Sequence, residues 1–106
     1  MAHVERRLSA RLSLPYAARL WGVDVQGKAL KEDATVENIS TGGLYLRLKR
    51  SVPTSSRVYV AARLSNQGRG QTPALRLVAS GIVVRTDAYP DGSCGVAVEF
   101  TRRRVL

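Results

Sequence analysis

Residues 38–48 read Asn-Ile-Ser-Thr-Gly-Gly-Leu-Tyr-Leu-Arg-Leu, a polar turn that runs directly into an apolar segment. From Leu44 to Leu48 a leucine stands at every second position, which is the period of a strand with one buried face. The adjacent glycines and short polar side chains before it are typical of a tight turn. The stretch therefore predicts two strands joined by a turn, the second of them covering residues 44–48.

Strand-like segments extend in both directions from this turn. Each is short, carries alternating or β-branched apolar residues, and is bounded by turn residues. In the first segment Trp21, Val23 and Val25 share one face, and we expect Trp21 to lie in the core. The predicted strands cover residues 16–25, 34–39, 44–48, 57–64, 75–86 and 95–100.

Two further positions carry turn or bend signals. Gly81 lies inside the fifth predicted strand and indicates a bulge or bend there. Pro90-Asp91-Gly92 predicts a hairpin turn between the last two strands, because proline fixes φ and glycine supplies a positive φ. Short strands separated by turns about every ten residues indicate an all-β barrel or sandwich.

The length of 106 residues fits a single domain. We expect a flexible basic N-terminal arm over residues 1–13, a β-barrel body over 14–101 and a basic tail over 102–106. The sequence shows no long amphipathic helix, no signal peptide and no apolar run that would span a membrane. These features predict a cytoplasmic location.

The charge balance restricts the kind of partner. Seventeen lysines and arginines against eight aspartates and glutamates give a formal net charge of +9, which predicts an anionic partner: nucleic acid, a nucleotide, phosphate or a membrane surface. The single cysteine, Cys94, and the single histidine, His3, offer no set of ligands for a metal ion. The carboxylates on the predicted strands have no histidine near them, so we predict neither a metal site nor enzymatic activity.

Two short motifs stand out from this background. Arg7-Leu8-Ser9-Ala10-Arg11 places two arginines four residues apart, which in a helix is unfavourable unless an anion satisfies both. Asn38-Ile39-Ser40-Thr41-Gly42-Gly43 carries an amide and a hydroxyl on an exposed turn, where glycines let the backbone approach a ligand closely. Taken separately, each also fits an ordinary structural role, as a basic tail and a tight hairpin.

Together, and in this order, the motifs resemble the PilZ domain family, the bacterial receptors for cyclic di-GMP. The family's pattern is Arg-x-x-x-Arg near the N-terminus, followed by Asp/Asn-x-Ser-x-x-Gly. The segments Gly81–Arg85 and Gly95–Phe100 also look like the last two strands of the family. The sequence departs from the family at Asn38, where aspartate is commoner. It also ends soon after the last strand, so we expect little or no C-terminal helix.

The resemblance implies a six- to seven-stranded antiparallel β-barrel of PilZ type that binds a ligand without catalysis and without a cofactor. A cation directly before the arginine motif, as in this sequence, implies that cyclic di-GMP is bound as an intercalated pair. Because the sequence carries one domain, the signal would pass to a separate effector protein. The implied ligand-binding residues are Arg6, Arg7, Arg11, Asn38, Ser40 and Gly43.

Two other functions fit the same sequence. A basic β-barrel can bind single-stranded nucleic acid, but such proteins stack bases on exposed aromatic side chains. This chain has six aromatic residues, and the most suitable, Trp21, is expected inside. A degenerate PilZ adaptor that has lost its ligand is the other alternative, and the intact Arg-x-x-x-Arg motif argues against it. Nucleic acid is therefore not the expected partner.

Overall fold

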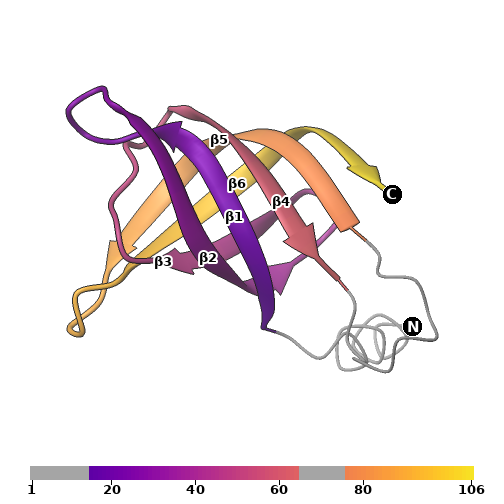
Figure 1. Ribbon diagram of the computed structural model, residues 1–106, viewed down its shortest axis with the longest axis horizontal. Helices are drawn as coiled ribbons and strands as arrows, with labels where there is room; N and C mark the ends of the chain where they lie inside the picture. Colours follow the sequence, from indigo (N-terminus) through magenta and orange to yellow (C-terminus); the bar gives the residue numbers. More distant parts are fainter. Residues whose placement is uncertain (1–14, 65–75) are drawn as a thin grey trace.

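The computed structural model describes residues 15–64 and 76–106, which form six antiparallel strands. The strands close into a barrel in the order β1, β2, β3, β6, β5, β4 (Figure 1). No helix occurs in either described range, so the predicted all-β barrel is confirmed. The strands are β1 (Tyr16–Val23), β2 (Ala29–Ile39), β3 (Gly43–Leu48), β4 (Arg57–Arg63), β5 (Arg76–Ala88) and β6 (Cys94–Val105).

Alternating side chains fill the interior of the barrel. In β3, Leu44, Leu46 and Leu48 are buried, and the residues that alternate with them are only partly covered. This is the pattern that the period of two predicts. Apart from Tyr16, no described residue with a polar or charged side chain is buried. The polar chemistry of this part of the chain therefore lies on the outer face. The most completely enclosed side chains are Leu20, Val36, Leu46, Val52, Val58, Val83 and Val96.

The facing of β1 is opposite to the sequence prediction. Trp21 is 39% exposed, whereas its neighbour Leu20 is fully buried and pairs with Val60 of β4. Both faces of β1 carry apolar residues, so alternation alone did not determine which face points inwards. The expectation that Trp21 lies in the core is wrong, and an indole ring is left on the surface.

The end of β6 also differs from the prediction. Residues 102–105, predicted to form a basic tail, continue β6 and pair with residues 77–80 of β5. Main-chain pairing with β5 does not depend on side-chain type, and all three arginines in this segment are exposed. Figure 1 shows β5 and β6 as a long coiled pair that crosses the barrel. Main-chain pairing also extends β2, which begins at Ala29. The strand therefore includes a charged stretch that the alternation of apolar residues did not reveal.

The two predicted turn and bend positions are confirmed. Gly92, in the turn between β5 and β6, has a φ of 90°, a value that side-chain-bearing residues rarely adopt. The register of β5 against β6 shifts between Ser80 and Gly81, which is the irregularity expected at that glycine.

Gly43 begins β3 and lies close against the backbone of β6. It pairs with Glu99, and a Cβ atom at Gly43 would collide with the carbonyl oxygen of Val98. The neighbouring Gly42 has open space around its Cβ position. Gly43 is therefore required by strand packing, whereas Gly42 is not.

The two glycines provide a matched test of this contact. We expect Gly43→Ala to lower the free energy of unfolding by about 1–3 kcal/mol, because the β6 backbone must move to admit the methyl group. Gly42→Ala should change it by less than about 0.5 kcal/mol. Urea denaturation of both variants measures the difference, and equal stabilities would contradict the close approach of β3 to β6.

Candidate ligand-binding site

The turn between β2 and β3 presents the second sequence motif on the outer face. A register shift between Val36 and Asn38 interrupts the pairing of β2 with β3. As a result Glu37 and Asn38, although consecutive, are both exposed. No residue pattern in the sequence predicted this bulge. It brings the Asn38 side chain to the same surface as the turn that follows.

The turn itself is held by main-chain and hydroxyl hydrogen bonds. The Ser40 amide donates to the carbonyl oxygen of Gly43 at 2.9 Å, and the Gly42 amide donates to the Ser40 hydroxyl at 3.3 Å. The Phe100 amide of β6 donates to the Gly42 carbonyl at 2.9 Å, which ties the turn to the barrel. Ser40 is exposed, so its hydroxyl is available to a ligand while it supports the turn.

An open hollow of about 520 Å³ lies beside this turn. It brings together Asn38, Ser40 and Gly43 of the predicted site. The predicted Arg6, Arg7 and Arg11 lie outside the described residues. The hollow also includes two residues that the sequence analysis missed as site residues, Tyr45 and Arg85. The described residues that line it are Glu37, Asn38, Ser40, Gly43, Leu44, Tyr45, Arg85 and Ala97.

A signal for these two residues was present in the sequence. Tyr45 occupies an outward position between buried leucines of β3, so a polar aromatic side chain there belongs to the outer face. Arg85 ends the segment that resembles a family strand. The pairing of β3 and β5 with β6 on either side was needed to show that both reach the hollow beside Asn38.

A hydrogen-bonded cluster fixes Tyr45 and Arg85 in place. The Tyr45 hydroxyl donates to Asp87 Oδ2 at 2.6 Å and lies 2.6 Å from the Tyr89 hydroxyl. The Arg85 guanidinium donates to the same Asp87 oxygen at 3.3 Å, and its carbon lies 5.4 Å from the centre of the Tyr45 ring. The Arg85 guanidinium is thus oriented by an anion and by an aromatic ring.

These contacts also set the protonation of the cluster. The hydrogen bond from Tyr45, followed by those from Arg85, lowers the pKa of Asp87 below its ordinary value of 3.8. Burial, reinforced by the hydrogen bonds to Asp87 and Tyr89, raises the pKa of the Tyr45 phenol. At neutral pH Asp87 is therefore a carboxylate and Tyr45 a neutral donor.

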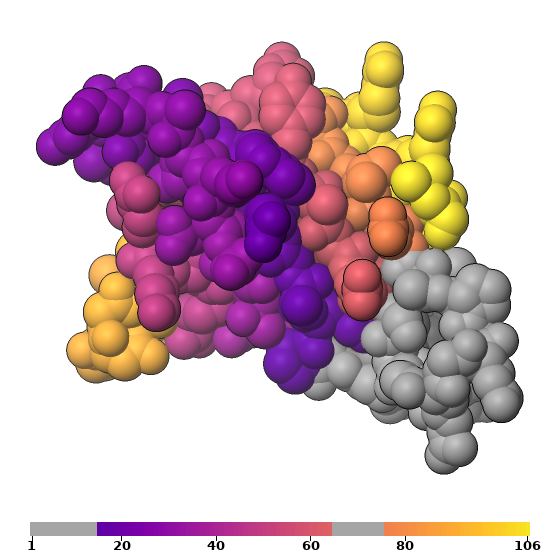
Figure 2. All heavy atoms as spheres, viewed as in Figure 1, coloured from indigo at the N-terminus to yellow at the C-terminus, as the bar shows by residue number. Residues whose placement is uncertain are grey.

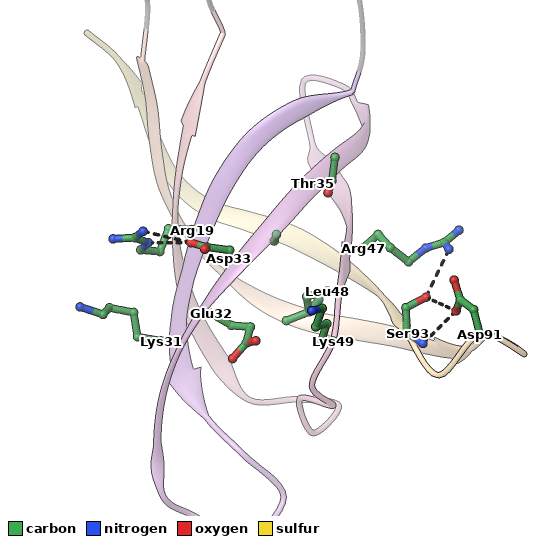
Figure 3. A pocket seen from close by; sticks show the side chains of 11 residues that line it. Arg19, Lys31, Glu32, Asp33, Thr35, Arg47, Leu48, Lys49, Asp91 and Ser93 are labelled. Atoms are coloured by element: carbon green, nitrogen blue, oxygen red, sulfur yellow. Dashed lines mark hydrogen bonds and ion pairs between the residues drawn. The ribbon is translucent and has the colours of Figure 1, made fainter.

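Arg47 holds the adjoining part of the outer face. Its guanidinium carbon stacks 3.5 Å from the centre of the Tyr89 ring, and its terminal nitrogens donate to Ser93 and Glu37, both at 3.3 Å. Figure 3 shows Arg47 reaching from β3 towards Ser93 and Asp91 in the β5–β6 hairpin. The stack and hydrogen bonds fix the hairpin against β3.

A second hollow, of about 710 Å³, is lined by the residues drawn in Figure 3, most of them on β2 and β3. Some of its charges are paired within the protein. Arg19 forms an ion pair with Asp33 at 3.0 Å, and Asp91 accepts hydrogen bonds from Ser93. Asn38, Ser40 and Gly43, the predicted ligand-binding residues that the structure describes, do not line it. The hollow beside Asn38 and Ser40 is therefore the better candidate site.

The described ranges thus form a closed β-barrel with an open polar hollow beside a hydrogen-bonded turn. Within the described ranges, no group of histidine, cysteine, aspartate or glutamate side chains is suited to hold a metal ion. No helix in those ranges is long and apolar enough to cross a membrane.

The family model of the PilZ domain matches residues 5–105, and the chain belongs to the PilZ domain family. The match spans both motifs on which the resemblance was based. PilZ domains are generally cyclic di-GMP-binding and adaptor modules, not enzymes. Comparisons with curated proteins and with solved structures give no match.

We expect the pKa of Asp87 to depend on the hydrogen bond from the Tyr45 hydroxyl. Tyr45→Phe removes the strongest hydrogen bond to the carboxylate, so the pKa of Asp87 should rise towards its ordinary value. Carboxyl-detected NMR titration measures it. Tyr59→Phe, a change at an exposed tyrosine on β4, is the control and should leave this pKa unchanged.

The same lowered pKa gives a pH dependence of stability. Ionised Asp87 stabilises the fold above its unfolded-state pKa, and this contribution is lost as the pH falls through the lower folded-state pKa. The decrease in the free energy of unfolding caused by Tyr45→Phe should therefore be larger at neutral pH than at a pH below the folded-state pKa of Asp87, where the carboxyl group is protonated. The same Asp87 pKa in parent and Tyr45→Phe would show that the phenol does not control the carboxylate.

Proposed function

We propose that this PilZ domain binds cyclic di-GMP in the hollow beside the Asn38–Gly43 turn, closed by Arg6, Arg7 and Arg11. The observation that carries the proposal is the family match over residues 5–105, which includes both motifs. It is supported by the hollow, which brings Asn38 and Ser40 beside Arg85.

The residues suit the chemistry of this ligand. A guanidinium pairs in bidentate fashion with phosphate oxygens and with O6 and N7 of guanine, and it also stacks on a purine face. The Asn38 amide oxygen accepts from guanine N1–H or N2–H, and the Ser40 hydroxyl either donates or accepts. Compared with the aspartate more common in the family, Asn38 lacks a negative charge but adds an N–H donor.

The proposed mechanism is binding followed by a change of surface. The N-terminal arginines fold over the ligand while the barrel remains rigid, and a separate effector protein recognises the altered surface. No cofactor and no chemical step are involved. Because cyclic di-GMP is a bacterial second messenger, we place the protein in the bacterial cytoplasm.

Isothermal titration calorimetry with cyclic di-GMP tests this function. We expect binding to the parent and a loss of affinity of about ten- to a hundredfold in Arg7→Ala and Arg11→Ala, because each removes a charge-assisted contact. Arg57→Ala, which removes an exposed cation on β4 outside the hollow, serves as a charge-matched control and should bind normally.

Competition with cyclic di-AMP tests the reading of guanine edges. Equal affinity for the two dinucleotides would refute guanine recognition. No heat of binding with any dinucleotide would refute the proposed function and favour a PilZ adaptor without a ligand. Arg7→Ala and Arg11→Ala proteins that bind like the parent would show that the arginine motif does not contact the ligand.

The number of ligands bound depends on Arg6 in this proposal. An intercalated pair of cyclic di-GMP molecules doubles the phosphate charge and exposes additional guanine edges, which requires an additional cation. The net charge of +9 further attracts the doubled anion. We expect two ligands per chain, with Arg6→Leu shifting the ratio towards one. A parent ratio near one, or an unchanged ratio in Arg6→Leu, would contradict this role.

A further inference from the structure

A second face of the barrel carries exposed aromatic residues. Trp21 of β1 and Tyr59 of β4 pair directly across the two strands, and they are 39% and 54% exposed. The same row continues from Tyr59 to Ser80 of β5 and from Ser80 to Arg102 of β6. The outward side chains of β1, β4, β5 and β6 thus form one row that begins at the Trp21 indole and ends at the Arg102 guanidinium.

The neighbouring row has small apolar side chains at its centre. Ala61 of β4 pairs with Val78 of β5, and Val78 pairs with Arg104 of β6. The small side chains leave a hollow of about 490 Å³ between the aromatic side and the arginine side. We call this the Trp21 groove. The described residues that line it are Trp21, Tyr59, Val60, Ala61, Val78, Ala79, Ser80, Arg102, Arg103 and Arg104.

One rim of the Trp21 groove is strongly basic. Arg102, Arg103 and Arg104 are exposed, and none of the described residues lining the groove is acidic. In Figure 2, side chains at the end of β6 (yellow) project from the surface at the upper right, near those of β4 (rose) and β5 (orange). Arg103 is oriented by a 2.6 Å hydrogen bond to the carbonyl oxygen of Thr41.

We propose that the Trp21 groove docks an acidic segment of an effector protein that inserts an aliphatic or aromatic side chain between Tyr59 and the arginines. Tryptophan, tyrosine and arginine are the residues that contribute most to protein interfaces. An apolar patch with a polar rim is typical of such surfaces. The arginine rim is complementary in charge to aspartate and glutamate, with which guanidinium groups form bidentate pairs.

The floor of the groove favours a protein segment over single-stranded nucleic acid. The outward methyl groups of Ala61 and Val78 line the space between the aromatic pair and the arginines. Such a floor removes an apolar side chain from water, whereas a nucleobase requires a flat aromatic surface on which to stack. Exposed Trp21 nevertheless supplies the aromatic surface that the sequence analysis expected to be missing, so nucleic acid must be tested directly.

Trp21 is the only tryptophan in the chain and therefore reports on its own groove. The probe is a synthetic peptide with one central leucine flanked on both sides by aspartates and glutamates, and it contains no aromatic residue. Added to the full chain without cyclic di-GMP, it should produce a saturable blue shift of Trp21 emission. Because the nucleotide is absent, the outcome is independent of the proposed ligand. Replacing the peptide's leucine by serine should abolish the shift without altering the protein.

Protein variants locate the binding. Tyr59→Ala and the double variant Arg102→Glu, Arg104→Glu should each weaken peptide binding about tenfold or more. The matched double variant Lys28→Glu, Lys49→Glu reverses the same number of exposed charges outside the groove and should bind like the parent. Thermal unfolding checks that each variant remains folded.

Three results would overturn the proposal. The first is an absence of any change in Trp21 emission with the acidic leucine peptide. The second is equal weakening by the two charge-reversal variants, which would show attraction by net charge alone. The third is a response to oligo-deoxythymidine that the peptide does not compete away, which would assign the groove to single-stranded nucleic acid.

Discussion

Closure of the barrel, completed where Leu20 of β1 pairs with Val60 of β4, forces each strand to divide its side chains between an apolar interior and an outer face. The interior of the described barrel holds apolar residues and the ring of Tyr16. Recognition by this part of the protein must consequently use the outer face, where Asn38 and Ser40 lie. A rigid closed barrel also removes most free strand edges, so side chains and turns, not strand addition, supply the contacts.

Strand β6 contacts the Asn38–Gly43 turn and also lines the Trp21 groove. Its Phe100 amide binds the Gly42 carbonyl, and its Arg103 side chain binds the Thr41 carbonyl in the same turn. Arg103 also lines the Trp21 groove. The turn that carries Asn38 and Ser40 is therefore in direct contact with the strand that forms the basic rim of the second surface. This contact links the proposed ligand site to the proposed docking site.

The sequence predicted the strand pattern well where one face was apolar and the other polar. In β3 the leucine alternation determined both the strand and its buried face. In β1 apolar residues on both faces left the orientation of Trp21 undetermined, and the prediction was wrong. The three arginines of β6 carry no alternation, so only the pairing with β5 reveals that they belong to a strand. The motif at Asn38–Gly43 was visible in the sequence, but Arg85 required the tertiary arrangement.

The proposed function depends on ligand binding in the hollow beside Asn38 and Ser40. Amide-resolved NMR of the isotope-labelled full chain, with and without cyclic di-GMP, tests it most directly. We expect the largest chemical-shift changes at the amides of Asn38, Ser40 and Gly43 and at the Arg85 side chain, with small changes at Tyr59 and Ala61. Changes centred on β4 and the Trp21 groove, with none at the Asn38–Gly43 turn, would contradict it.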